Sequence, residues 1–402
     1  MKPKLFISAF AVALLFQIGC SKNQALSPEA EALQTPQEVE TQELAFSSGN
    51  DSEGITVMTR NIYVGTDVDV VLAAQRPEEI PVLVAQAFQT LLATNFHERA
   101  RALADEIKRN RPHLVGLQEV SLIRTQSPGD AVVGGATPAE TVRFDYLAIL
   151  MDALKKRGLR YRVAGIIANA DVEVPMLVNT NPLAFDDVRL NDYDVVLARH
   201  DVKISKVAQA NYQTRLVIPS LGGVQIPRGF VAVNARIDHK TIRFVNTHLE
   251  PASIPDLLPI QLGQAQELAA ILQNETLPVV LVGDLNTSAP TGPTYQFLLG
   301  KGFRDLWTLK SNRDEGKGYT SPHDADLRNT TVHLDKRIDL ILAKTNNASA
   351  ERLKKGLVAR VVGDELRDRT PSGLWPSDHA GVVARFHLQK AKHEILAQAD
   401  EK

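Results

Sequence analysis

Residues 280–287 read Val-Leu-Val-Gly-Asp-Leu-Asn-Thr, and this stretch does most to decide the fold. An apolar, β-prone run ends at Gly283, a residue type that allows a sharp turn. Asp284 and Asn286 follow on the same face, so both can contact one substrate atom. The stretch therefore predicts a buried strand with polar side chains at its end. It is equally consistent with an Asx turn that closes the strand.

Outward from this stretch, the chain alternates β-like runs with amphipathic helical patterns from Gly54 onward. Runs such as 230–237 and 242–249 lie too close for the long crossover of a parallel pair, which favours antiparallel pairing. The pattern predicts an α+β fold in which two sheets pack face to face with helices outside. The expected strands are 55–62, 114–120, 161–167, 195–199, 230–237, 242–249, 278–283, 338–343, 357–362 and 381–387, and the expected helices are 97–110, 141–157 and 258–273.

An apolar, helix-prone segment at residues 66–95 interrupts this alternation. It predicts either a lid over a site or an extra helix that covers the edge of the sandwich. We favour the covering helix.

Polar side chains stand at the ends of several other β-like runs. Burying a carboxylate or an imidazole there costs free energy unless the group is paired or binds a metal. The repetition indicates one shared site rather than isolated accidents. The side chains are Asn61, Glu119, His248, Asp339, and Asp378 with His379.

Five of these residues suggest a specific chemistry. Asn61 and Glu119 offer amide and carboxylate oxygens, a ligand set that suits a hard cation such as Mg²⁺, whereas zinc favours His or Cys. Asp378 and His379 place a charge partner and a base in one turn. Asp339, inside an apolar run, needs a partner, and an imidazole is a good candidate.

The N-terminus has the pattern of an export signal. Lys2 and Lys4 precede an apolar run at 5–16 that is too short for a transmembrane helix of about 20 residues. The only cysteine, Cys20, follows in a context that resembles a bacterial lipoprotein signal, although Gln17 stands where leucine is usual. The alternative is an ordinary cleaved signal with an incidental cysteine.

We therefore expect four segments. Residues 1–19 form a signal peptide, after which Cys20 is acylated; residues 20–53, rich in Glu, Gln, Ser and Pro, form a disordered polar tether. Residues 54–388 form the catalytic domain, and 389–402 are a polar tail without an assigned function. A length of 402 residues with 44% hydrophobic content supports a substantial core. A net charge of −2 gives no global basic field of the kind that drives non-specific nucleic-acid binding.

The ordered set of motifs resembles the endonuclease/exonuclease/phosphatase superfamily, to which deoxyribonuclease I and neutral sphingomyelinases belong. The resemblance runs from about Ile55 to Phe386 and implies a four-layer, deoxyribonuclease I-like α/β/β/α sandwich. The motifs, in order, are Asn61, Gln118-Glu119, Asn-Thr-His-Leu at 246–249, Gly-Asp-Leu-Asn at 283–286, Arg-Ile-Asp at 337–339 and Ser-Asp-His at 377–379.

The resemblance also implies roles for these side chains. Asn61 and Glu119 would bind Mg²⁺, with Mn²⁺ or Ca²⁺ as alternatives, and His379 would be the catalytic histidine. Asp339 would orient His379, and Asp284 and Asn286 would contact the attacked phosphate and its nucleophilic water. Asp378 would be a phosphate-facing carboxylate, and His248 would stabilise the transition state or the leaving group. Arg199 would bind phosphate.

The implied activity is hydrolysis of a phosphodiester by in-line attack of an activated water. Either the His379–Asp339 pair or Asp284 would take the proton, and the substrate is a nucleic acid or a phospholipid headgroup, as in sphingomyelinases and phospholipases C. A phosphomonoesterase is less favoured because no Lys and Arg cluster is evident. The alternative is a catalytically inactive surface module that binds a partner. We expect a monomer that is exported and held at a membrane through Cys20, facing the periplasm or the cell exterior, or otherwise secreted.

Overall fold

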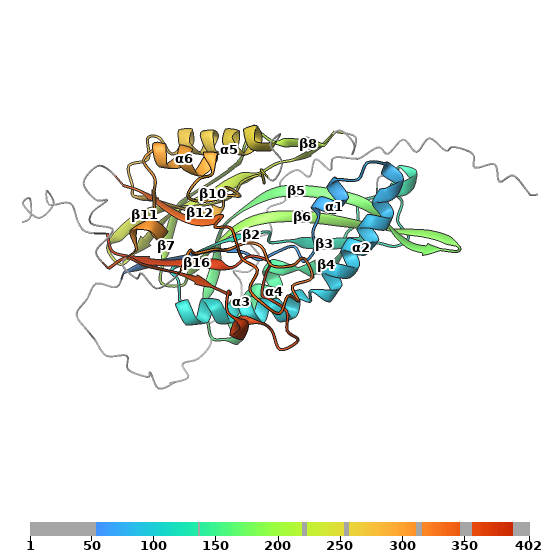
Figure 1. The fold of residues 1–402 in the computed structure, drawn as a ribbon, viewed down its shortest axis with the longest axis horizontal. Coiled ribbons are helices and arrows are strands. Elements are labelled where there is room, and N and C mark those ends of the chain that lie inside the picture. Colours follow the sequence, from blue (N-terminus) through green and yellow to red (C-terminus); the bar gives the residue numbers. More distant parts are fainter. Residues whose placement is uncertain are drawn as a thin grey trace, which may run out of the picture.

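Two large β-sheets packed face to face, with helices outside them, make up the protein (Figure 1). The computed structural model describes residues 54–135, 137–218, 223–252, 257–310, 316–345 and 356–388. The predicted α+β class with two packed sheets is confirmed. The signal peptide, Cys20, the tether and the tail lie outside the described residues.

The first sheet has the strand order β15-β16-β1-β2-β6-β3-β4, and β5 pairs with β6. Most neighbours are antiparallel, but β1 and β2 run parallel. Its strands are β1 (Ile55–Asn61), β2 (Leu114–Gln118), β3 (Leu122–Gln126), β4 (Thr141–Asp145), β5 (Tyr161–Thr180), β6 (Leu183–Arg199), β15 (Val358–Val362) and β16 (Gly381–Phe386).

The second sheet has the order β13-β14-β12-β11-β10-β7, and here β11 and β12 run parallel. A separate pair, β8 (Leu216–Ile218) and β9 (Val224–Ile226), is antiparallel. The strands of the second sheet are β7 (Lys203–Asn211), β10 (Gly229–Ile237), β11 (Lys240–His248), β12 (Val279–Asp284), β13 (Arg304–Asp305) and β14 (Asp339–Lys344).

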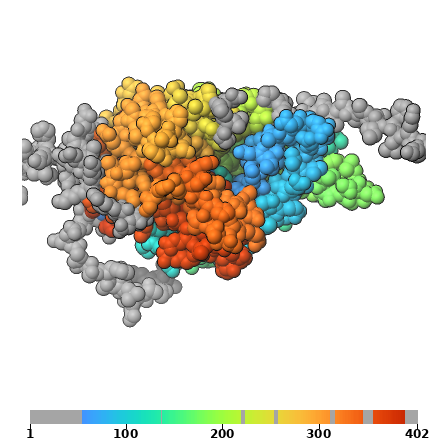
Figure 2. Space-filling model, in the orientation of Figure 1, coloured from blue at the N-terminus to red at the C-terminus, as the bar shows by residue number. Residues whose placement is uncertain are grey.

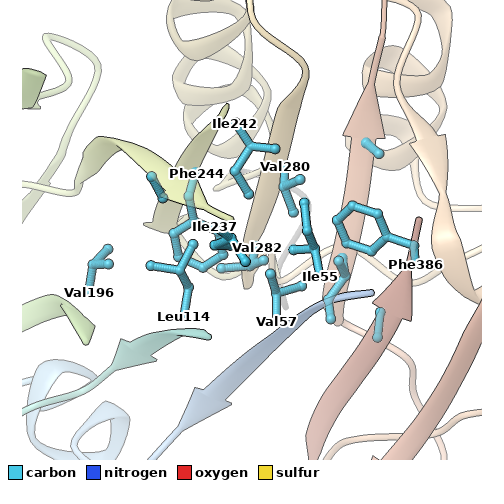
Figure 3. Packing of buried hydrophobic residues seen from close by; sticks show 14 of the residues in the cluster. Ile55, Val57, Leu114, Val196, Ile237, Ile242, Phe244, Val280, Val282 and Phe386 are labelled. Atoms are coloured by element: carbon cyan, nitrogen blue, oxygen red, sulfur yellow. The ribbon is translucent and has the colours of Figure 1, made fainter. Parts of the chain in front are cut away.

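The core lies between the two sheets, where buried aliphatic side chains interdigitate. Figure 3 shows Val57 and Leu114 of the first sheet facing Phe244 and Val282 of the second. Helices α3 (Phe96–Asn110) and α4 (Tyr146–Lys156) pack on the outer face of the first sheet, and α5 (Leu258–Ile271) and α6 (Pro293–Gly300) pack on that of the second. In the described residues, no helix is both long and apolar enough to cross a membrane.

The segment at 66–95 forms α1 (Asp69–Leu72), a 3-10 turn and α2 (Ile80–Ala93). Helix α2 packs against β5, in agreement with the covering-helix interpretation. Figure 2 shows this segment, in blue, at the same end of the molecule as the tip of the β5–β6 hairpin, in green.

Two sequence expectations were wrong in extent. The helix expected at 141–157 begins only at Tyr146, because 141–145 pair with β3 as β4 and Asp145 caps the helix by accepting from the Ala148 N–H at 2.9 Å. The strands expected at 161–167 and 195–199 are the first part of β5 and the last part of β6, which pair with each other at the base of one long hairpin. Polar and half-exposed residues fill its middle, so no apolar run marks it in the sequence.

Candidate active site

The topology brings the predicted polar residues to one edge of the sandwich. Parallel strands end at the same edge, so Asn61 of β1 lies beside Gln118 of β2, and His248 of β11 lies beside Asp284 of β12. Strand β14 is antiparallel to β12, which pairs its first residue, Asp339, with Asp284. The two sheets therefore contribute opposite halves of a single site.

Gly283 lets the end of β12 approach the neighbouring strand closely, and this places Asp284 in the cluster. A Cβ atom at position 283 would lie 1.9 Å from the Thr247 carbonyl oxygen of the neighbouring strand, and the backbone has a φ of +155°. Asn286 then takes a left-handed φ of 50°, and its N–H donates to Asp284 Oδ1 at 2.9 Å. The Asx turn predicted for residues 280–287 is therefore present, and it lies within this cluster of polar side chains.

Glu119 and Asn61 form the first part of the site. Asn61 Nδ2 donates to Glu119 Oε1 at 2.8 Å and to Asp284 Oδ2 at 3.2 Å. The second oxygen of Glu119 accepts from the Val64 N–H at 2.8 Å. Asn61 Oδ1 accepts from the Tyr63 N–H at 2.9 Å, which leaves one of its lone pairs for another ligand.

This donor set fits a divalent cation. Two carboxylates converge on a single amide nitrogen, so the point between them attracts positive charge. The available donors of Glu119, Asp284 and Asn61 are all oxygens, the type that Mg²⁺, Mn²⁺ and Ca²⁺ prefer. A second candidate cluster adjoins it, because ligand atoms of Asp284, Asp339 and His379 lie within 4.8 Å of one another.

His379 is paired with Asp339 inside the site. Its Nδ1 lies 2.8 Å from Asp339 Oδ2 and 3.7 Å from Asp284 Oδ2, and all three side chains are buried. Burial disfavours the charged imidazole, but Asp339, Asp378 and Asp284 outweigh it and hold the pKa of His379 well above its usual range. Asp339 Oδ1 has no hydrogen-bond partner among the described residues, so one oxygen of this carboxylate is left for a ligand or water.

The two remaining carboxylates are protonated more easily than usual. Burial raises the pKa of Asp284 to about 7, with Asp339 adding to the shift and His379 opposing it. Burial likewise raises the pKa of Asp378 to about 6. Asp378 also accepts from the Ser377 hydroxyl at 3.3 Å.

His248 lies beside Asp284 as a neutral imidazole. Its Nδ1 lies 3.0 Å from Arg228, whose guanidinium only donates, and its Nε2 lies 3.1 Å from Asn286 Nδ2. Nε2 also lies 3.6 Å from Asp284 Oδ2. Burial, Arg228 and His379 together hold the pKa of His248 well below its usual range.

Arg199 is not part of this cluster. It ends β6 next to the start of β2, at the edge of the sheet away from Glu119, and it is paired there with Asp201 at 2.7 Å. Its guanidinium also donates to the Arg111 carbonyl. The resemblance that suggested phosphate binding rested on its place after a strand, but the strand direction carries it away from the site.

Buried arginines that the sequence did not single out hold the loops of the site in place. Arg99 donates to the carbonyls of Ile62 and Pro376 at 2.7 and 3.1 Å, and so joins the loop after β1 to the loop before Asp378. Arg60 donates to the His379 carbonyl and forms an ion pair with Glu106 of α3 at 3.0 Å. These contacts join residues far apart in sequence, so no local pattern predicts them.

The Arg60–Glu106 pair gives a stability prediction. Glu106→Ala should lower the free energy of unfolding by about 3–5 kcal/mol, because the buried Arg60 guanidinium would lose its charge partner. Urea unfolding would measure it. Asp152→Ala, which breaks the exposed pair with Lys156, is the control and should have no measurable effect. Equal stability of the two variants would contradict the prediction.

Comparisons with known proteins identify the family of this fold. The model of the Endonuclease/Exonuclease/phosphatase family matches residues 88–379. No match was found among curated proteins. An endonuclease/exonuclease/phosphatase family protein from Leptotrichia buccalis is 16% identical with a TM-score of 0.50, and the alignment covers 83% of this chain and 100% of that one.

Two further structures were compared. A family protein from Bacteroides thetaiotaomicron is 14% identical with a TM-score of 0.50, covering 84% of this chain and 98% of that one. Truncated TDP2 from Caenorhabditis elegans is 19% identical with a TM-score of 0.46, covering 83% and 97%. At these identities the likeness shows a shared fold alone.

Proposed function

Since the chain belongs to the endonuclease/exonuclease/phosphatase family, whose members hydrolyse phosphoric esters, we propose that it is a divalent-metal-dependent phosphodiesterase. One observation carries the proposal. Asp284 lies at the centre of a buried cluster, with Asn61, His248 and His379 each within 3.7 Å of the same carboxylate oxygen, Oδ2. Such a cluster offers a proton acceptor, hydrogen-bond donors and a cation-binding pair in one place.

Glu119 and Asn61 would hold the metal ion. When bound, Mg²⁺ would neutralise phosphate charge and stabilise the leaving oxygen. The Val64 N–H fixes the Glu119 carboxylate, and the Tyr63 N–H fixes the Asn61 amide, so both side chains are oriented before any ligand arrives.

Asp284 is the side chain best placed to take a proton from the attacking water. His379 is less suited to this step because the surrounding carboxylates keep its imidazole positively charged. Its Nδ1 donates to Asp339, and its Nε2 lies 3.4 Å from the Ser321 hydroxyl, so the Nε2–H would donate to a phosphoryl oxygen in place of that contact. The Asn286 amide and the His248 imidazole, whose Nδ2 and Nε2 lie 3.1 Å apart, supply a further donor for the charge that develops on the phosphorus oxygens.

The substrate belongs to one of two classes of phosphodiester, nucleic acids or phospholipid headgroups. A panel of plasmid DNA, RNA, sphingomyelin, phosphatidylcholine and a chromogenic diester, each with Mg²⁺, Mn²⁺ or Ca²⁺, tests the proposal. We expect hydrolysis of at least one diester, lost on adding EDTA and in His379→Ala. Activity that survives both treatments would refute the mechanism, and inactivity on every substrate would favour a non-catalytic binding module.

We further propose that the enzyme is exported and anchored through an acylated Cys20. The support is the sequence of residues 2–20, in which two lysines are followed by an apolar run and then by the cysteine. Fractionating cells that express wild type or Cys20→Ser and repeating the same assay locates the enzyme. The expected result is activity in the membrane fraction for wild type only.

A further inference from the structure

A second group of buried oxygen donors lies where β5 bends against β6. The ladder pairs Ala168 with Tyr193 and then Asp171 with Asn191, so Asn169 and Ala170 on one strand oppose only Asp192 on the other. This is a β-bulge, a feature that redirects side chains. It brings the Asn169 amide to the Asp192 carboxylate, with Nδ2 donating to Oδ2 at 3.1 Å.

Asp194, two residues along β6, lies on the same face of the strand as Asp192, and its ladder partner Ile167 stands two residues before Asn169. Burial and the neighbouring Asp192 charge raise its pKa well above the usual range. The exposed fractions of Asn169, Asp192 and Asp194 are 3%, 7% and 0%. Three buried carboxylate and amide groups are therefore neighbours at this bulge.

Three oxygens of this group lack hydrogen-bond partners among the described residues. Neither Asp194 Oδ1 nor Oδ2 accepts a hydrogen bond from any residue that the structure describes, and the same holds for Asn169 Oδ1. A buried carboxylate without a hydrogen-bond partner is unfavourable, so proteins rarely keep one without a ligand, a bound water or a shared proton.

Nearby positive charge does not balance these carboxylates. Arg228 lies 3.9 Å from Asp192 Oδ2, but it is closer to Glu250, at 3.2 Å. Burial raises the pKa of Asp192 to about 6, and the charge of Glu119 in the candidate active site adds to this shift. The carboxylate of Asp192 is therefore repelled by that of Glu119. The group therefore has more negative charge than its single arginine neutralises.

We propose that Asp192, Asp194 and Asn169 form a second cation site, which takes a hard divalent ion of the Mg²⁺ and Ca²⁺ class. The donors are two carboxylates and an amide oxygen, with no histidine or cysteine among them, which suits these ions and not zinc. An ion there satisfies the three unpartnered oxygens and balances the excess negative charge.

The site also has a connection to the catalytic residues. The same Arg228 nitrogen that lies 3.9 Å from Asp192 lies 3.0 Å from His248 Nδ1. A cation bound to Asp192 and Asp194 neutralises those two carboxylates in place of Arg228. The Arg228 guanidinium then interacts with His248 and Glu250 alone. The second ion thus positions Arg228, while the Glu119 site serves the chemistry.

Calorimetric titration of the chelator-treated full chain with Mn²⁺, and separately with Ca²⁺, tests this inference without any activity assay. Asp194→Asn should bind one ion fewer than wild type, and Glu119→Gln should keep the ion that Asp194→Asn loses. Asp171→Asn is the matched control, since it removes a β5 carboxylate that is paired with Arg189 outside the group, and it should bind as wild type does.

Thermal unfolding gives a second readout that does not depend on the Asp194 variant. In Glu119→Gln, Ca²⁺ or Mn²⁺ should still raise the midpoint of unfolding, because the second site is intact. Equal ion counts in wild type and Asp194→Asn would overturn the inference, as would the absence of any ion-dependent shift in Glu119→Gln. In that case Asp192 and Asp194 share a proton. Both outcomes leave the proposed phosphodiesterase activity to its own test.

Discussion

Asp284→Asn should lower the rate of diester hydrolysis by about 10²- to 10⁴-fold, the contribution expected of a positioned general base. The substitution keeps an oxygen that can accept from the Asn286 N–H, so the turn after β12 should survive. It removes the proton acceptor that lies within 3.7 Å of both His248 and His379. Steady-state hydrolysis of a chromogenic diester with saturating Mg²⁺ measures the effect.

Asp201→Asn is the control for this variant. Asp201 is also a carboxylate in a tight pair, with Arg199, but it lies at the far edge of the first sheet. It should retain the wild-type rate. A rate for Asp284→Asn within tenfold of wild type would reduce Asp284 to a turn residue and move the proton acceptor to another group.

Glu119→Gln should shift the Mg²⁺ requirement of the reaction. The amide has the shape of the carboxylate but no charge, so the ion should bind more weakly and activity at a fixed low Mg²⁺ concentration should fall by more than about 100-fold. This exceeds the 10- to 100-fold cost typical of an outer-shell partner. Rates measured over a range of Mg²⁺ concentrations should show half-saturation at a higher concentration than in wild type.

Glu140→Gln serves as the comparison, because Glu140 is an exposed residue just before β4. Its Mg²⁺ curve should overlay that of wild type. If the curves of Glu119→Gln and wild type coincide instead, the metal is held elsewhere, and the adjoining cluster of Asp284, Asp339 and His379 becomes the leading candidate.

The sequence predicted the parts of the fold and the site that are encoded locally. Apolar runs located the central strands, and the polar residues that end them, such as Asn61, Glu119 and Asp284, do meet at one edge. The match to the family model and the two packed sheets with outer helices confirm the expected deoxyribonuclease I-like sandwich.

What the sequence missed depends on long-range geometry. The β5–β6 hairpin is held by cross-strand pairing of polar residues and a bulge, neither of which has a local apolar signature. Arg228 reaches His248 across 20 residues, and Arg60 reaches Glu106 across 46. The prediction that Arg199 binds phosphate was wrong because it used only the position of Arg199 at the end of a strand. A residue at a strand end lies at the site only when that strand runs toward the site.

The division of the site between two sheets has a consequence for the evolution and engineering of this chain. Asn61, Glu119 and His379 belong to the first sheet or its flanking loops, whereas His248, Asp284 and Asp339 belong to the second. Gln118 joins the halves by donating to Asn246 at 2.6 Å, and Asn246 in turn donates to the Leu117 carbonyl at 2.9 Å. Neither sheet alone carries the whole cluster, so a fragment with one sheet would lack half of the candidate site. We expect insertions and deletions to be tolerated best away from the junction of the sheets, in the 66–95 segment, the tip of the β5–β6 hairpin and the β8–β9 pair.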